Sequence, residues 1–283
     1  MDQIDEFESM FKAAEREQFV YADVPIDSIT IISDRNRDAA ATLRPSVSSF
    51  LSRVEDAQHW RVIAAEDFSN VTQLLTRLDE EKTDLIITYR HLFEESLVPQ
   101  HSLGVYLDVL TQVTTIPVLV LPGTAVEPVS LADRSCERVM IVADHISGDA
   151  ALINYGARMV RSGGTLWLCH IEDDAIFNRY ADVIGRIPEI DTDEACRLIE
   201  AQLLKEANDY IETCIAELTE RGPNVSYHAS VSMGHFLRQY RDLVSDNEID
   251  LLVANTNDED QLAMHGMAYS LSIELCDVPM LLL

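Results

Sequence analysis

The stretch DLLV at Asp250–Val253, followed by Gly266 and then by VPMLLL at Val278–Leu283, has a second copy earlier in the chain. The earlier copy consists of DLII at Asp84–Ile87, Gly104 and IPVLVL at Ile116–Leu121. In both copies the glycine lies thirteen residues before the proline of the apolar run (104 to 117 and 266 to 279). A repeat of this length indicates two related domains rather than a solenoid, because each copy is long enough to bury its own core.

Each copy opens with a short β-rich run that ends in aspartate, at Ser28–Asp34 and at Arg138–Asp144. Both runs are rich in β-branched residues, as expected of a strand that is buried on both faces. The aspartates Asp34 and Asp144 fall at the carboxyl ends of these strands, where open α/β sheets bind their ligands. We therefore treat both as candidate binding residues.

Length and composition favour a protein of two ordinary domains, since 283 residues with 47% apolar residues can bury two cores. A net charge of −28 argues against nucleic acid or an anionic membrane as a partner, because both would be repelled. This charge could reflect a high-salt environment or simply an acidic protein.

The sequence contains no uninterrupted apolar run of about 18 residues and begins with acidic residues, so we expect no membrane insertion, no secretory signal and a cytoplasmic location. The five cysteines are odd in number and form no Cys-x-x-Cys pair, which predicts neither a disulfide framework nor a zinc site. The histidines show no metal-ligand spacing, so no metal is expected.

Strands and helices are predicted to alternate in both copies. The expected strands cover residues 28–33, 59–65, 84–89 and 117–121, and then 138–143, 165–170, 225–231, 250–254 and 280–283. The expected helices cover residues 37–54 (disturbed by Pro45), 71–81 and 105–114, and then 150–161, 192–220, 235–244 and 268–276. An acidic loop is expected to begin at Glu172, and residues 1–17 have the pattern of an amphipathic helix that packs on its own chain or at a subunit interface.

The connection between the copies is predicted at residues 123–134, which are rich in proline and in small or polar residues. The N-terminal domain then covers residues 1–124 and the C-terminal domain residues 135–283. The first copy is shorter by about one strand and one long helix, so it is expected to lack one βα unit.

This order of elements resembles the universal stress protein family. The resemblance rests on the first strand that ends in aspartate, the Asp-Leu-Leu-Val strand, and the glycine thirteen residues before Pro-Met-Leu-Leu-Leu. It covers residues 136–283 nearly end to end and residues 28–122 with one βα unit absent. It implies an α/β fold with two doubly wound, Rossmann-like parallel-sheet domains in tandem.

Nucleotide-binding members of that family carry Gly-x-x-Gly after the fourth strand and, nine residues later, Gly followed by Ser or Thr. Here only Gly266 matches: Asn255 and Asp258 stand at the first two positions, and Met267 replaces the hydroxyl residue. The loop between them carries three carboxylates, which oppose a triphosphate. No cofactor is therefore expected, although the resemblance leaves room for an adenine nucleotide with fewer phosphates.

The candidate residues for such a ligand are those at the strand ends. In the second copy they are Asp144, His145, Ala254, Asn255 and Gly266, and in the first copy Asp34. Alternatively, each aspartate caps the helix that follows it.

The arginines of the first copy allow two interpretations. Arg35 and Arg37 could occupy the carboxylate of Asp34. Arg90 and His91 could meet an anion, although a solvated loop is the more common role of such residues.

The resemblance implies a stress-response protein that acts as a partner-binding or regulatory scaffold. No catalytic motif is present, so we expect no enzymatic activity. The alternatives are a nucleoside or nucleotide sensor and, less favoured, a nucleotide hydrolase. The family also implies dimerisation, and the apolar runs Val118–Leu121 and Met280–Leu283 are candidates for pairing with each other, as a pseudo-symmetric monomer, or with another chain.

Overall fold

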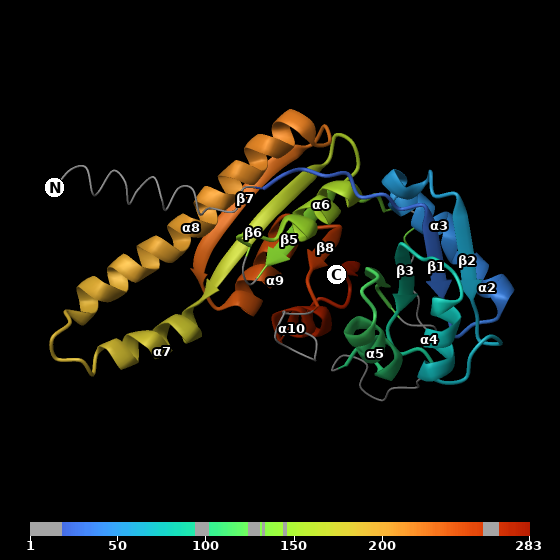
Figure 1. The fold of residues 1–283 in the computed structure, drawn as a ribbon, viewed down its shortest axis with the longest axis horizontal. Helices are drawn as coiled ribbons and strands as arrows, with labels where there is room; N and C mark the ends of the chain where they lie inside the picture. Colours follow the sequence, from blue (N-terminus) through green and yellow to red (C-terminus); the bar gives the residue numbers. More distant parts are fainter. Residues whose placement is uncertain (1–18, 94–101, 124–130, 132–133, 144–145, 257–265) are drawn as a thin grey trace.

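A computed structural model describes residues 19–93, 102–123, 131, 134–143, 146–256 and 266–283 (Figure 1). Its centre is one nine-stranded sheet in the order β2-β1-β3-β4-β9-β8-β5-β6-β7. The strands are β1 (Ser28–Ile32), β2 (His59–Ile63), β3 (Leu85–Tyr89), β4 (Val118–Leu121), β5 (Arg138–Ala143), β6 (Thr165–Asp173), β7 (Ser226–Gly234), β8 (Leu251–Ala254) and β9 (Met280–Leu282). The predicted α/β class with a doubly wound, mainly parallel sheet is confirmed.

Within each half, helices connect successive strands, as parallel pairing requires. They are α2 (Arg37–Ala41), α3 (Leu43–Phe50) and the 3₁₀ turn Ser52–Val54, then α4 (Val71–Asp79), α5 (Val105–Val113), α6 (Ala150–Met159), α7 (Asp174–Ile184), α8 (Thr192–Arg221), α9 (Phe236–Asp246) and α10 (Gly266–Glu274). α8 packs on β7 and β6, and α6 packs on β5 and β8. The first part of α8 and the whole of α7 extend beyond the sheet as a hairpin (Figure 1).

The two apolar runs of the repeat meet at the centre of the sheet. β4 and β9 pair in the antiparallel sense, with Leu119 opposite Leu281, whereas the other strand pairs are parallel. Both strands are buried along their whole length, which explains why they read as unbroken apolar runs. The expected pairing of the two runs with each other is confirmed, and neither strand offers a free edge to another chain.

The aspartate that begins each DLII or DLLV run has a structural role. Asp84 Oδ2 accepts hydrogen bonds from the backbone N–H groups of Asp27 and Ser28 at the start of β1 (3.1 and 2.9 Å). Asp250 Oδ2 accepts the equivalent bonds from Glu137 and Arg138 at the start of β5 (3.2 and 2.9 Å). In both halves the carboxylate ties two neighbouring parallel strands together where they begin.

The strand order of the first half, β2-β1-β3-β4, matches β6-β5-β8-β9 of the second half. Among the described residues, β7 and the long helix α8 that leads to it have no counterpart in the first half. This difference agrees with the length difference between the copies. The domain limits of 1–124 and 135–283 stay a prediction.

Two local expectations differ from the structure. The helix expected over residues 37–54 is broken at Thr42, so that Pro45 lies in the first turn of α3, where proline is tolerated. The loop expected to begin at Glu172 is absent: β6 continues to Asp173, whose side chain accepts a hydrogen bond from Ala175 N (2.8 Å) and caps α7. Three consecutive acidic residues thus form a strand end and a helix start.

Candidate functional site

At the carboxyl end of β1, the carboxylate of Asp34 is hydrogen-bonded to other groups of the protein. Its carboxylate accepts hydrogen bonds from the hydroxyl of Tyr89 and from the backbone N–H of Phe93 (2.8 Å to the latter). Burial, followed by the bond to Asp34, raises the pKa of Tyr89 well above its ordinary value, so the hydroxyl stays a donor. Asn36, not Asp34, caps α2 through a 2.9 Å bond from Ala39 N. The alternative that Asp34 is a helix cap is therefore wrong.

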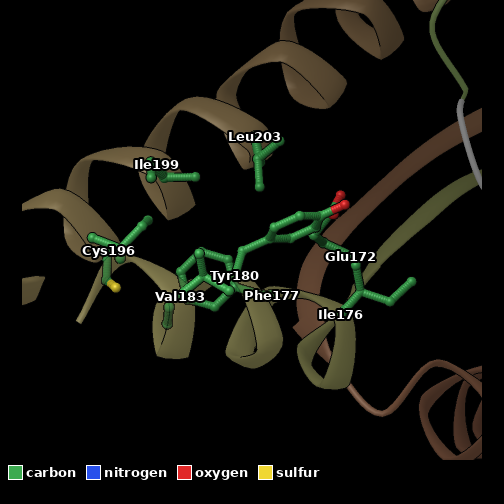
Figure 2. Close-up of a pocket in the computed structure, with 10 residues that line it drawn as sticks. Glu172, Ile176, Phe177, Tyr180, Val183, Cys196, Ile199 and Leu203 are labelled. Atoms are coloured by element: carbon green, nitrogen blue, oxygen red, sulfur yellow. The ribbon is translucent and has the colours of Figure 1, made fainter. Parts of the chain in front are cut away.

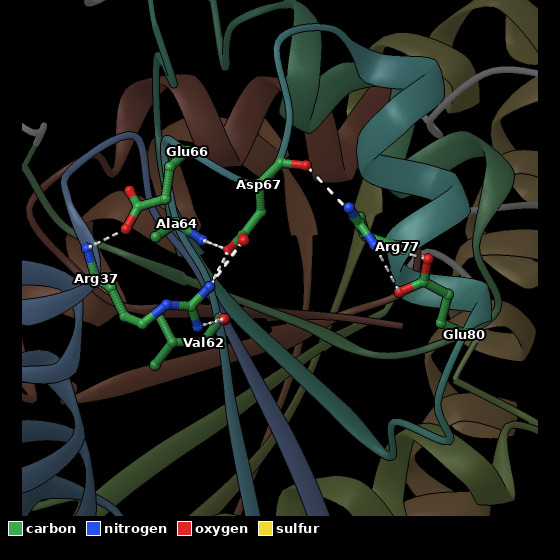
Figure 3. Close-up of polar contacts among 7 residues, drawn as sticks. All are labelled: Arg37, Val62, Ala64, Glu66, Asp67, Arg77 and Glu80. Atoms are coloured by element: carbon green, nitrogen blue, oxygen red, sulfur yellow. Dashed lines mark hydrogen bonds and ion pairs between the residues drawn. The ribbon is translucent and has the colours of Figure 1, made fainter.

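Arg37 does not form an ion pair with Asp34, because it pairs with a different aspartate. Its guanidinium forms an ion pair with Asp67 (2.6 Å) and donates a hydrogen bond to Val62 O (2.9 Å), as Figure 3 shows. Asp67 also accepts a bond from Ala64 N (2.8 Å), and Arg77 pairs with Glu80 (2.9 Å). These arginines fix the segment between β2 and α4.

Arg90 and His91 are buried, with only 4% and 3% of their surface exposed, so the expected solvated loop is wrong. Arg90 donates to the carbonyl oxygens of Ser272 (2.6 Å) and Cys276 (3.0 Å) at the end of α10. A cation at this position satisfies carbonyl groups that the helix leaves unpaired. Arg90 is thus a bridge between the two halves of the chain.

In the second half, Asp144 and His145 lie outside the described residues, as do residues 257–265. Ala254 is a buried residue of β8, and Gly266 is exposed at the start of α10, with open space around its Cα in the described part of the chain. The proposed roles of these residues in binding a nucleoside stay predictions.

Asn255 is brought next to Asp149, a residue that the sequence analysis did not single out. Asn255 Nδ2 donates to the carboxylate of Asp149, which also caps α6 by accepting from Leu152 N (3.0 Å). Burial raises the pKa of Asp149. An aspartate directly before the predicted helix start was a signal for the cap, whereas its contact with Asn255, 106 residues away, had no local signal.

A cavity with an apolar lining lies elsewhere, between α7 and α8 (Figure 2). It has a volume of about 380 Å³. Its lining residues are Glu172, Ile176, Phe177, Tyr180, Ala181, Val183, Ile184, Cys196, Ile199 and Leu203. We call this feature the α7–α8 groove. The apolar residues at 176, 177, 180, 181 and 184 have helical spacing, so the sequence did carry a signal for α7 that the acidic residues before it concealed.

Several of the large apolar side chains that line the groove are exposed to solvent. Ile176, Tyr180 and Val183 on α7 are 53%, 59% and 56% exposed, and Ile199 on α8 is 39% exposed. At its base Glu172 pairs with the buried His170 (Nε2 to Oε2, 3.3 Å). Large apolar side chains gathered in an exposed groove are typical of a docking surface.

Two absences apply to the described residues. No three His, Cys, Asp or Glu side chains there come close enough together to hold a metal ion. None of the helices there is long and apolar enough to cross a membrane.

No protein-family model and no curated protein matches this chain. Solved structures do. A functionally unknown protein from Pseudomonas aeruginosa PAO1 aligns with a TM-score of 0.51 and 14% identity, covering 91% of this chain and 92% of that chain. A protein assigned as a universal stress protein from Pseudomonas aeruginosa UCBPP-PA14 aligns with a TM-score of 0.51 and 13% identity, covering 91% and 93%. At this identity the comparison shows a shared fold, and the fold implied by the resemblance to universal stress proteins is confirmed.

Proposed function

We propose that this chain is a stress-response protein of the universal stress protein type that works in the cytoplasm by binding a protein partner. In this proposal it acts as a regulatory scaffold without catalysis and without a full ATP-binding motif. The observation that carries the proposal is the α7–α8 groove, an exposed apolar surface on a hairpin that has no counterpart in the described part of the first half.

The described polar groups at the strand ends support a scaffold over an ATP-binding protein. Asp34 is engaged by Tyr89 and Phe93, and Arg90 by two backbone carbonyls. The first half therefore uses these side chains to hold its own structure, so that Arg90 is not available to neutralise a phosphate and the Asp34 carboxylate already accepts hydrogen bonds from the protein.

The shape and charge of the α7–α8 groove suggest an amphipathic helix as the bound element. Two helices with an apolar furrow between them accept a third helix through its apolar face. Residues 172–206 carry ten acidic and four basic side chains, a net charge of −6. A partner helix with basic residues beside its apolar face would be attracted to this rim.

The test compares two neighbouring residues on α8. Ile199 lines the groove, whereas Leu198 is similarly exposed (52%) but does not line it. Immobilised parent protein, Ile199→Asp and Leu198→Asp would be incubated with extract of the source cells, and retained proteins identified by mass spectrometry. We expect a partner that the parent and Leu198→Asp retain and Ile199→Asp loses. Retention that is equal in both variants would refute the groove as the binding surface.

A second candidate is a nucleoside or AMP sensor, favoured by the half-buried Asp149–Asn255 pair next to the carboxyl ends of β5 and β8. Calorimetric titration with adenosine, AMP and ATP in the presence of magnesium tests it. The sensor predicts binding that Asp144→Ala abolishes and Asp34→Ala leaves intact. Release of phosphate from ATP above the buffer rate would instead support the weaker alternative, a nucleotide hydrolase.

A further inference from the structure

The hairpin formed by α7 and the first part of α8 has no buried core of its own. α7 contains no buried residue, and the buried residues of α8 begin at Ala207. Eleven large apolar side chains are exposed in the described part of the chain, and seven of them belong to this hairpin. The seven are Ile176, Tyr180, Val183, Ile187, Ile190, Leu198 and Ile199. Because a helix is stable when its apolar stripe is buried against another element, this hairpin presents a surface for further helices.

α7 carries two apolar rows, each with the four-and-three spacing of helices that pack on other helices. The first row is half-buried in the α7–α8 groove and consists of Phe177, Ala181 and Ile184. In the second row each residue is more than half exposed; this row consists of Ile176, Tyr180 and Val183. We call it the exposed row of α7. Since α8 leaves this row in contact with solvent, a helix from outside the hairpin can pack on it.

The charges of α7 differ from those of the rest of the hairpin. Residues 174–186 carry two aspartates and two arginines and so have no net charge, which places the whole −6 of residues 172–206 outside them. Arg179 and Arg186 follow Ile176 and Val183 by three residues each, on the side of the helix that carries the exposed row. Neither arginine forms an ion pair with a residue in the described ranges. α7 is therefore itself an amphipathic helix with basic residues beside its apolar face.

We propose that the helix bound in the α7–α8 groove is α7 of a second copy of this chain, so that two hairpins pack as a four-helix unit. The inference rests on the proposed function, because it names the partner of the same groove. A twofold axis between the copies lets each α7 bind the groove of the other copy, and one contact then buries the exposed row of both. Four helices around a shared apolar core are a common stable arrangement.

The net charge of −28 on each copy is compatible with this contact. The hairpin extends beyond the sheet, so two copies that meet through their hairpins keep their sheets apart (Figure 1). At physiological ionic strength, charges separated by more than about 8 Å are largely screened. Close to the contact, Arg179 and Arg186 of each copy meet the acidic residues around the groove of the other, and the local interaction is attractive.

Sedimentation velocity of the purified full-length protein from about 0.1 to 100 μM measures the monomer–dimer equilibrium. We expect the parent to form a dimer in this range. Ile199→Asp places a carboxylate in the apolar wall of the groove, so the dissociation constant of the dimer should rise by at least about a hundredfold. Leu198→Asp is the matched control, because Leu198 is 52% exposed but does not line the groove, and it should dimerise like the parent. A parent that is monomeric throughout, or equal dissociation constants in the two variants, would overturn the proposal.

A second pair of variants tests α7 as the bound helix. The first carries Arg179→Ser and Arg186→Ser, which remove the basic residues beside the exposed row. The second carries Arg77→Ser on α4 and Arg238→Ser on α9, which change the net charge equally on other elements. We expect the first variant to dimerise about fivefold more weakly than the second, because it loses two charge pairs at the rim of the contact. Equal dissociation constants would refute α7 as the bound helix.

Circular dichroism of each variant checks that it is folded. If Ile199→Asp does not fold, Ile176→Asp replaces it, because Ile176 also lines the groove and is 53% exposed. The capture experiment separates this inference from the proposed function. If both hold, the protein that the groove retains from the extract is this chain itself. A parent that stays monomeric while its groove retains a different protein would overturn the second copy and keep the groove as a binding surface, and a monomeric parent that retains nothing would refute both.

Discussion

Replacing Arg90 with methionine should weaken the connection between the two halves of the sheet. The substitution keeps an unbranched apolar stem but removes two charge-assisted hydrogen bonds, to Ser272 O and Cys276 O. Each such bond contributes about 1.5–3 kcal/mol. Burial, which lowers the pKa of Arg90, is a cost of the native cation that offsets part of this gain. We expect a net loss of about 3 kcal/mol in the free energy of unfolding.

Urea unfolding followed by tryptophan fluorescence measures this loss. Trp60 lies on β2 and Trp167 on β6, so single-tryptophan versions report on each half separately. We expect both midpoints to fall together, because β4 and β9 join the halves in one sheet. Arg37→Met is the matched control: its ion pair with Asp67 is half-exposed and should contribute less than about 1 kcal/mol. A loss for Arg90→Met no larger than that of the control would refute the bridging role.

Two further predictions concern the carboxylates of the fold. Asp84→Ala should destabilise the protein by about 2 kcal/mol, since it leaves the backbone N–H groups of Asp27 and Ser28 without their acceptor. Asp250→Ala should cost about the same, since Arg138 loses the acceptor of its backbone N–H and of its Nε, whereas Glu137 N–H keeps its bond to Ser135 O (2.9 Å). The urea midpoint of each variant checks this, and a loss in only one half would contradict the shared role of the two sites. The pKa of Asp149 is raised by burial, which means that the folded state binds the proton of this carboxyl group more tightly than the unfolded state does. The protonated side chain therefore contributes stability at low pH. This contribution is lost as the pH rises above 3.8, the ordinary pKa of an aspartate. Asp149→Asn, which keeps a capping side chain, should therefore gain stability relative to the parent between about pH 4 and 7, and a difference in midpoint that is independent of pH would contradict this.

The sheet was predictable because its signals are local. Buried parallel strands read as apolar runs, and the repeat of Asp250–Val253 and Val278–Leu283 at Asp84–Ile87 and Ile116–Leu121 showed that both halves share a topology. The pairing of the two apolar runs was one of the expected alternatives. The helix α7 was missed because Glu172, Asp173 and Asp174 were taken as a loop, although they end one element and cap the next.

The candidate site was less predictable because its contacts are distant in sequence. Asp34 is engaged by Tyr89, 55 residues away, and Arg90 by Ser272, 182 residues away. Nothing near Arg90 in the sequence indicates that it is buried, since an arginine directly after a strand most often lies in a solvated loop. The α7–α8 groove likewise depends on two helices meeting, which a helical pattern alone does not specify.

The antiparallel pairing of β4 with β9 joins two similar halves of a single chain, so a helix or a binding surface can be present in one half and absent from the other. A dimer of two identical chains must carry every helix and every binding surface twice. In this protein the two halves belong to one chain, so each can change without the other. The α7–α8 hairpin illustrates this, because the described part of the first half has no equivalent. One sheet of nine strands thus offers a single such groove among its described residues, and the stoichiometry expected for a bound helix is one per chain rather than one per half.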